Sequence, residues 1–236
     1  MSTSIYLYKD RIGCVDYVQH MGSDLTIVNS ARVSFGVESE SLTEKDIKLI
    51  HYLAKHKHTS TFEHNVVTFR FTVPLFVRSQ HHRHRTWSYN EISRRYTSAN
   101  MRFYEPIMFR TQHKVNRQAS EEILINPDLS SSGRGEWPPS QLLASDALMG
   151  HNKRSLDLYN LLLQNGICRE QARAVLPQSL YTEYYGTVNL NNLLKFVALR
   201  SHEGAQWEIQ QVAHACLEIA ADLWPNAVSA YTLGKD

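Results

Sequence analysis

The sequence predicts an α+β fold, and two observations lead to this prediction. Segments with helical periodicity are joined to a few segments with the alternation of strands, and no regular βαβ order connects them. The 236 residues are 42% hydrophobic and 20% charged, which is typical of a globular protein with a substantial core. Because no internal repeat is present and charged motifs lie in both halves, we expect one domain over residues 1–236.

The first half of the chain contains one clear helix and one clear strand. Residues 43–55 are expected to be helical, because Thr43 and Asp46 have the spacing of a capping pair before an apolar stripe. Residues 67–73 alternate apolar and polar side chains, which predicts a half-buried strand that ends at Pro74. Pro74 also suits the first turn of a following helix.

The second half is mostly helical. Hydrophobic periodicity predicts a long helix over 141–164, with Leu148, Leu158 and Leu162 on one face and a stop at Asn165-Gly166. The further expected elements are a short helix at 169–176, a strand at 180–188, a helix capped by Asn189 that runs to about residue 200, and a helix at 205–223 that is ended by Pro225. Residues 126–140 are rich in Ser, Gly and Pro and are expected to form a surface loop.

The net charge and the cysteines exclude several classes of protein. A formal net charge of +2 does not favour a broad nucleic-acid-binding face. The three cysteines, Cys14, Cys168 and Cys216, are far apart and form no CxxC pair, so we expect packing residues rather than disulfides or a zinc ribbon. With no signal peptide and no stretch of ~18 apolar residues, the expected setting is the reducing cytoplasm, without a membrane.

The segment Arg83–Tyr96, RHRTWSYNEISRRY, carries most of the chemical information. It gathers guanidiniums, an imidazole, hydroxyls, an amide and one carboxylate, a set that can bind phosphate and a nucleobase. Alone, it also allows an ordinary solvated basic loop, or a module that binds nucleotides or RNA without catalysis and stacks bases on Trp87, Tyr89 and Tyr96. The histidines of residues 51–64 and 81–84 suggest a metal site only weakly, since no tetrahedral ligand spacing is present and the adjacent arginines repel a cation.

The same segment matches RHRxxSxNExSxR, the signature of the flavin-dependent thymidylate synthases, at every fixed position. Four other segments resemble that family in the same order: Met21–Phe35, His58–His64 (HTSTFEH), Arg173–Thr182 and Ala198–Gln210. The resemblance implies helices around a small, mainly antiparallel sheet. It implies an FAD-dependent methyltransferase that converts dUMP to dTMP, with methylenetetrahydrofolate and NADPH as co-substrates, in a homotetramer with shared active sites. No metal is implied.

The resemblance also implies two sets of site residues. Those around dUMP would be Gln80, Arg83, Glu91, Ile92, Ser93, Arg94, Arg95, Arg173 and Arg200. Those around FAD would be His58, Ser60, Glu63, Arg83, His84, Arg85, Asn90, Glu91, Asn189, Asn191 and Lys195.

Arg200 and Ser93 are the expected catalytic residues. A guanidinium beside the N3/O4 edge of uracil stabilises the negative charge that develops there, and the Ser93 hydroxyl would position the ring. Three positions depart from the family pattern. Thr61 replaces a proline, Asn191 replaces an arginine, and Lys195 stands one helical turn after Asn191, where it can restore the missing charge.

Overall fold

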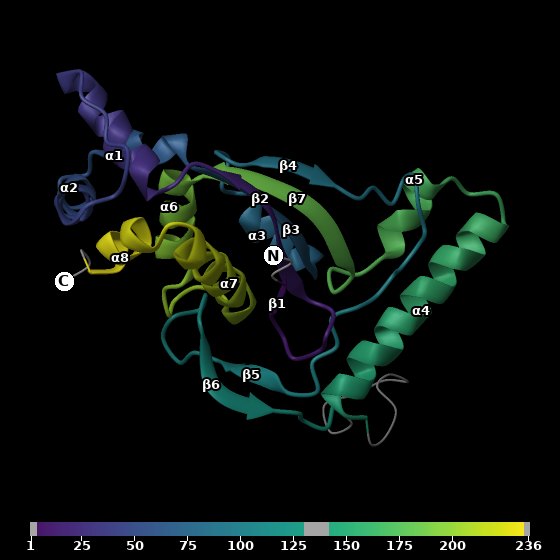
Figure 1. Ribbon diagram of the computed structural model, residues 1–236. Helices are drawn as coiled ribbons and strands as arrows, with labels where there is room; N and C mark the ends of the chain where they lie inside the picture. The colour runs from purple at the N-terminus through teal and green to yellow at the C-terminus, as the bar shows by residue number, and fades with distance from the viewer. Residues whose placement is uncertain (1–3, 130–141, 234–236) are drawn as a thin grey trace. The chain divides into compact units, whose positions relative to one another are not determined.

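The computed structural model describes residues 4–129 and 142–233 (Figure 1). Contacts divide the chain into two compact units. Unit 1 comprises Met1–Thr72, Gln80–Asn90 and Glu183–Asp236, and unit 2 comprises Val73–Ser79 and Glu91–Thr182. The single domain therefore stays a prediction, and the two units are described in turn. Residues 130–140 of the predicted loop lie outside the described residues.

A five-stranded sheet forms the centre of the fold, in the order β1-β2-β3-β7-β4. Its strands are β1 (Ser4–Tyr6), β2 (Cys14–Met21), β3 (Val66–Pro74), β7 (Tyr181–Asn189) and β4 (Ser88–Glu91). The pairs β1·β2 and β2·β3 are antiparallel. Together with the helices, this sheet confirms the α+β prediction, while its strands β1, β2 and β4 were not predicted from the sequence.

The strand predicted at residues 67–73 is β3, but its expected half-burial is wrong. The apolar positions are buried as expected, and Thr68 and Thr72 on the alternate face are buried too. The reason is that β3 lies inside the sheet between β2 and β7, and the Thr68 hydroxyl hydrogen-bonds that of Thr187 on β7 at 2.9 Å. A threonine pair can fill a buried face that period-2 alternation assigns to solvent.

Two capping residues of unit 1 begin the helices that were predicted from them. Thr43 caps α2 (Glu44–Lys55) and forms the expected reciprocal pair with Asp46. The side chain of Asn189 accepts a hydrogen bond from the Asn192 amide at 2.9 Å and caps α6 (Leu190–Arg200). The other helical elements are α1 (Asp24–Arg32), η1 (Val33–Phe35), η2 (Thr59–His64) and α7 (Trp207–Leu223), while α3 (Leu75–His81) directly follows Pro74.

Pro225 begins a helix that was not predicted from the sequence. It ends α7 as expected, but α8 (Pro225–Leu233) starts at this proline, which suits a first helical position because it lacks an amide hydrogen. The buried carboxylate of Asp24 accepts hydrogen bonds from the amides of Asn226 and Ala227 at 3.0 and 3.1 Å. An acidic side chain from the start of α1 therefore caps α8.

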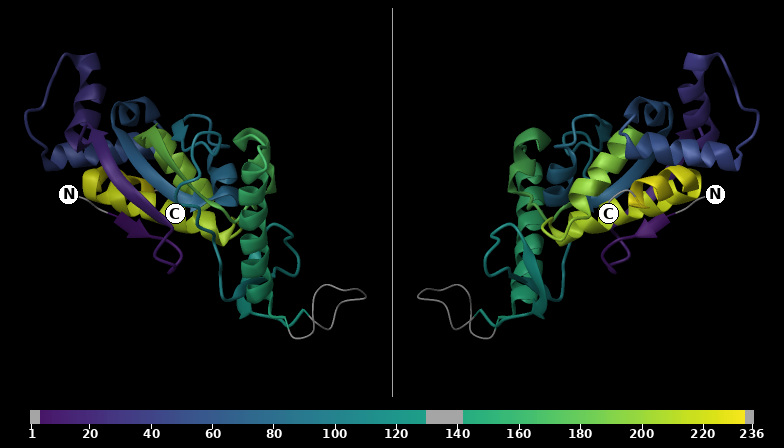
Figure 2. Two further views of the ribbon diagram at one scale, coloured as in Figure 1. Left: turned by 90° about the vertical axis from the view of Figure 1, so that its right-hand side faces the viewer. Right: turned by 90° about the vertical axis from the view of Figure 1, so that its left-hand side faces the viewer.

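Unit 2 contains the hairpin of β5 (Phe109–Gln112) and β6 (Ser120–Ile125), followed by the long helix α4 (Ala144–Gln164). Figures 1 and 2 show α4 as one straight rod. It starts three residues later than predicted and ends at Asn165, where Gly166 has φ +82° as the Asn-Gly stop requires. The predicted helix at 169–176 is α5 (Arg169–Ala172) with the 3₁₀ turn η4 (Arg173–Val175).

The predicted leucine face of α4 is not its buried face. Leu158 is exposed, whereas the buried positions are Ser145, Ala147, Asn152, Ser155 and Tyr159. Polar contacts explain the difference. Asn152 donates to Glu105 at 3.0 Å and accepts from Ser179 at 2.7 Å, so small and polar side chains hold the helix within unit 2.

Candidate functional site

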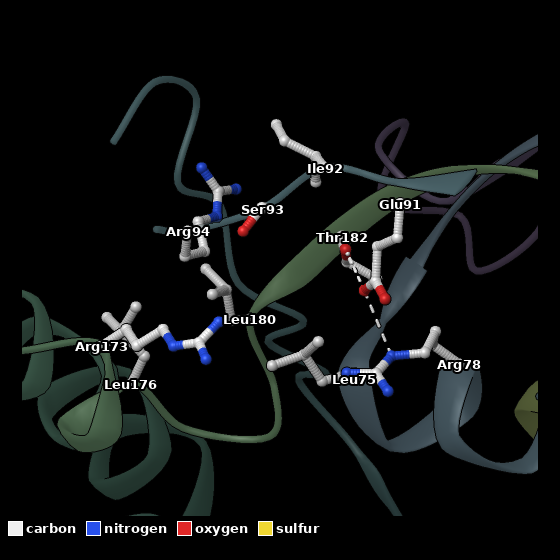
Figure 3. Close-up of a pocket in the computed structure, with 10 residues that line it drawn as sticks. All are labelled: Leu75, Arg78, Glu91, Ile92, Ser93, Arg94, Arg173, Leu176, Leu180 and Thr182. Carbon is white, nitrogen blue, oxygen red and sulfur yellow. Dashed lines mark hydrogen bonds and ion pairs between the residues drawn. The ribbon is translucent and has the colours of Figure 1, made fainter. Parts of the chain in front are cut away.

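Unit 2 contains a pocket of about 350 Å³ (Figure 3). Its wall combines three arginines, one carboxylate, two hydroxyls and four aliphatic side chains. The lining residues are Leu75, Arg78, Glu91, Ile92, Ser93, Arg94, Arg173, Leu176, Leu180 and Thr182.

Four elements bring these residues together. Glu91 is the last residue of β4, and the three residues that follow it also line the pocket. Arg173 is the first residue of η4, and Thr182 is the second residue of β7. Leu75 and Arg78 are three residues apart and share a face of α3. The first turn of α3 is tied to the segment before β7, because the Leu75 amide donates to the Leu180 carbonyl at 3.0 Å.

The pocket carries three positive charges and one negative charge, an excess of two positive charges. The carboxylate of Glu91 is held on two sides: its Oε1 accepts from the Thr182 hydroxyl at 2.7 Å and lies 3.2 Å from the Arg78 Nε. In the view of Figure 3, Arg173 extends into the pocket from the side opposite Glu91. Guanidiniums with an excess of two charges suit a phosphate monoester, which carries nearly two negative charges at neutral pH.

Five of the predicted dUMP residues meet in this pocket: Glu91, Ile92, Ser93, Arg94 and Arg173. Arg95 is also in unit 2, but it does not line the pocket, and its guanidinium pairs with Glu170 at 3.3 Å. Arg78 and Thr182 were missed. No sequence signal marked either residue: Leu75, which shares a helix face with Arg78, was not a predicted site residue, and nothing in the sequence marks Thr182 as a partner of Glu91.

Unit 1 holds the expected catalytic arginine. The Arg200 Nε donates to the His84 Nε2 at 3.0 Å, and a terminal nitrogen of the same guanidinium lies 3.5 Å from the Gln80 carbonyl oxygen. The Tyr89 hydroxyl lies 2.9 and 3.2 Å from the carbonyl oxygens of His81 and His84, and its one hydrogen, shared between them, ties Tyr89 to the turn that carries the imidazole. The guanidinium of Arg200 is thereby oriented by His84, which lies 116 positions earlier in the sequence.

The environment keeps His84 in the form that can accept this hydrogen bond. Burial, and secondarily the Arg200 guanidinium, lower the pKa of His84 to about 4. The ring is therefore neutral at pH 7 and offers a lone pair to Arg200. Burial also lowers the pKa of Arg200, although the guanidinium stays protonated.

Acidification is expected to destabilise the protein through His84. Its folded pKa of about 4 lies below the unfolded value of about 6.5, so the unfolded state binds more protons between these values. Stability is therefore lost as the pH falls from 6.5 towards 4. Chemical denaturation across this range checks the sign, with His84→Gln as the control that lacks the titrating group. The stability advantage of the parent over His84→Gln should shrink on acidification, and a constant difference would contradict this role.

His81 belongs to the core of unit 1. It is fully buried, its Nδ1 lies 2.8 Å from the Tyr184 hydroxyl, and its ring packs between Trp87 and Phe196, with centroid distances of 4.5 and 4.7 Å. Desolvation lowers the pKa of His81 well below its ordinary value. Across the described residues, no group of three or more His, Cys, Asp or Glu side chains is arranged to hold a metal ion.

The residues expected around FAD that come from η2 and α6 lie together in unit 1. The amide of Asn191 is buried and donates to the Glu63 carboxylate at 2.6 Å. The backbone amide of Leu190 donates to the Asn65 carbonyl at 2.8 Å and ties the start of α6 to the end of η2. Around this junction His58, Ser60 and Lys195 are exposed. Asn189 is engaged as the helix cap.

The arginine-rich signature is divided between the two units. Arg83, Arg85 and Asn90 are exposed residues of unit 1, and the chain enters unit 2 at Glu91. The imidazole next to Arg200 and the pocket carboxylate thus come from one short segment. The signature therefore contributes His84 to the group around Arg200 in unit 1 and Glu91 to the pocket in unit 2.

The cysteine prediction holds for one residue and is wrong for another. Cys216 is buried in α7, Cys14 is half-buried, and Cys168 is exposed, so Cys168 is not a packing residue. It stands at the N-cap of the short helix α5, where the chain turns at the surface of unit 2. Burial raises the pKa of the Cys14 and Cys216 thiols, the opposite of what a nucleophilic cysteine requires.

Comparison with known proteins identifies close relatives. The sequence model of the family described as "Thymidylate synthase complementing protein" matches residues 16–226. A flavin-dependent thymidylate synthase of Thermus thermophilus is 42% identical, covering 93% of this chain and 75% of the relative. One from Kosmotoga olearia is 39% identical, over 93% of this chain and 90% of the relative.

A solved structure has the same fold. It is the UMP/dUMP methylase PolB from Streptomyces cacaoi bound with 5-Br UMP, with a TM-score of 0.75 and 30% sequence identity, covering 93% of each chain. The same methylase bound with 5-Br dUMP matches with a TM-score of 0.74. In the part of the chain that the structure describes, no helix is long and apolar enough to cross a membrane.

Proposed function

Because the chain belongs to the flavin-dependent thymidylate synthase family, we propose that it converts dUMP to dTMP, with methylenetetrahydrofolate as the carbon donor and NADPH-reduced FAD as the source of hydride. The observation that carries the proposal is the pocket of unit 2. There Glu91, Ser93 and Arg94 of the signature meet Arg173, from a segment about eighty residues away, in a wall with an excess of two positive charges.

Each residue type of the pocket has a role that suits a nucleoside monophosphate. Arg94 and Arg173 would hold the phosphate through charge-assisted hydrogen bonds. Ser93 would position the pyrimidine, and the aliphatic side chains of Leu75, Leu176 and Leu180 provide apolar surface next to the charged groups. A site of this kind fixes orientation with few polar groups and excludes water with the others.

Arg200 would act on the uracil ring. The reaction needs C5 of uracil to attack a one-carbon unit, and this step places negative charge on the N3/O4 edge. A guanidinium already oriented by His84 and the Gln80 carbonyl can stabilise that charge without reorganising. Gln80 and Arg83, which adjoin this group in the sequence, complete the proposed dUMP contacts.

The donors around η2 and α6 fit a flavin dinucleotide. His58, Ser60 and Lys195 offer exposed donors near the Glu63–Asn191 pair, and Arg83, Arg85 and Asn90 add two charges and an amide that suit a diphosphate. When bound, FAD would supply the redox chemistry, which no side chain of this protein provides. Asn191 removes a charge from this region, and the exposed Lys195 one turn later restores it.

A homotetramer in the cytoplasm is part of the proposal. Helix α4 exposes Leu158 and Leu161, which are three residues apart on one face, and an exposed apolar pair of this kind suits contact with other copies of the chain. All three cysteines are free, which is compatible with a reducing compartment.

Turnover with the complete set of reactants tests the proposal. Purified protein supplied with FAD, NADPH, methylenetetrahydrofolate and dUMP should form dTMP. Omission of any one component should abolish it. Formation of dTMP without the folate, or none with all four present, would refute the assignment.

The cysteines are expected to be dispensable for this reaction, since none of the three lines the pocket and burial raises the pKa of the Cys14 and Cys216 thiols. The triple variant Cys14→Ala/Cys168→Ala/Cys216→Ala should lose some thermal stability, because Cys216 is buried, but should keep its rate of dTMP synthesis per folded molecule. Circular dichroism establishes the folded fraction. Complete loss of turnover in a folded variant that binds dUMP normally would point to covalent catalysis by a thiol.

A further inference from the structure

Glu91 places a negative charge in the wall of a pocket that suits a dianion. A carboxylate that faces a phosphate repels it, and the repulsion is strong where water is partly excluded. The side chain of Glu91 is 24% exposed and that of its partner Arg78 is 30% exposed, so solvent screens this region only in part. The negative charge therefore needs a permanent partner within the wall.

Arg78 is that partner. Its Nε lies 3.2 Å from the Glu91 Oε1, and the Thr182 hydroxyl donates to the same oxygen at 2.7 Å (Figure 3). Both contacts fall on Oε1, and among the described residues no hydrogen bond is seen at Oε2. The carboxylate is thus fixed and its charge compensated, while one oxygen can still accept a hydrogen bond from a ligand.

The other two arginines of the pocket are placed differently. Arg94 donates to the Ala99 carbonyl at 2.6 Å, and Arg173 approaches from the opposite side in Figure 3. Arg78 comes from α3, outside the arginine-rich signature, and its guanidinium forms an ion pair with Glu91. The negative charge of Glu91 is therefore compensated by the side chain of Arg78.

We propose that Arg78 is a positioning residue for the substrate: it fixes and neutralises Glu91, so that the pocket keeps its positive excess for a phosphate dianion and one carboxylate oxygen stays available to a ligand hydroxyl. This inference rests on the proposed function. It explains how the proposed dUMP site can contain a carboxylate and still bind a phosphate. Arg78 acts through Glu91 and not on the phosphate itself.

A double-mutant cycle tests the inference by calorimetric binding of dUMP and deoxyuridine. Arg78→Gln should weaken dUMP binding about tenfold or more, the size expected for a charge-assisted contact in a partly buried site. Deoxyuridine, which has no phosphate, should be affected much less, and Arg78→Lys should restore most of the affinity. In a Glu91→Gln background, Arg78→Gln should change dUMP affinity by less than about threefold, because the charge to be compensated is gone.

Two further variants keep the test decisive. Arg70→Gln breaks an exposed Arg–Glu pair with Glu183 in unit 1 and should leave dUMP binding unchanged. Thr182→Val removes the other contact to Glu91 and should weaken dUMP binding only when Glu91 is present, so it serves in place of Arg78→Gln if that variant does not fold.

Equal losses with and without Glu91 would overturn the inference, because Arg78 would then contact the ligand directly. An unchanged dUMP affinity in folded Arg78→Gln would overturn it as well, since the ion pair would be only structural. A parent protein that binds no dUMP would refute the pocket assignment together with the inference. A parent that shows the predicted cycle but forms no dTMP would refute the proposed function alone.

Discussion

Arg200→Lys is expected to slow methyl transfer to dUMP by about 10²–10³, the loss typical of one oxyanion-type donor. Lysine keeps the positive charge but loses the planar fork, including the Nε hydrogen that His84 accepts at 3.0 Å. The ammonium can therefore no longer be held at the edge of the uracil by the same contact. Affinity for dUMP should fall only modestly, because the arginines of the unit 2 pocket remain.

Single-turnover measurements on pre-reduced enzyme separate these effects for Arg200. Oxidation of NADPH in the absence of dUMP should be nearly unchanged in the variant, because the uracil takes no part in that step. Arg70→Lys is the matched control, since Arg70 pairs with Glu183 away from the Arg200 group. A variant that transfers the one-carbon unit at the parent rate and is impaired only in binding would make Arg200 an ordinary ligand contact.

Arg173→Ala is expected to weaken dUMP binding by about 1.5–3 kcal/mol, the contribution of a hydrogen bond to a charged group. Arg173 lines the pocket opposite Glu91, and its removal takes away one of three positive charges. Affinity for deoxyuridine should change far less, because it lacks the phosphate. Titration calorimetry with both ligands measures the difference.

The control for Arg173→Ala is Arg169→Ala. Arg169 belongs to the preceding helix α5 and is exposed, and it does not line the pocket. The same change of charge there should leave dUMP binding within about twofold, as expected for a screened surface residue. Equal losses for dUMP and deoxyuridine in Arg173→Ala would show that this guanidinium does not hold the phosphate.

Local signals in the sequence predicted the elements that depend on local chemistry. Thr43 and Asn189 cap the helices expected of them, and the apolar positions of β3 are buried as the alternation indicated. The missed elements depend on distant residues. Helix α8 is capped by Asp24, about two hundred positions earlier, and the buried Asn152 of α4 is paired with Ser179. Hydrophobic periodicity cannot report a polar contact between remote segments.

The same limit applies to the site. The signature located Glu91, Ser93 and Arg94, and the resembling segment Arg173–Thr182 located Arg173, so these pocket residues were predicted from the sequence. Arg78 and Thr182 were not, because their role exists only where α3 and β7 meet the end of β4 within unit 2. The orientation of Arg200 by His84 likewise joins residues 116 positions apart.

The most direct test of the central claim follows the methylene carbon. Flavin-loaded protein is incubated with NADPH, dUMP and methylenetetrahydrofolate labelled at the methylene carbon, and the nucleotides are analysed by mass spectrometry. The proposed function predicts dTMP that carries the labelled carbon, formed only when dUMP and the folate are both present. Protein that binds FAD and dUMP yet forms no labelled dTMP would contradict it.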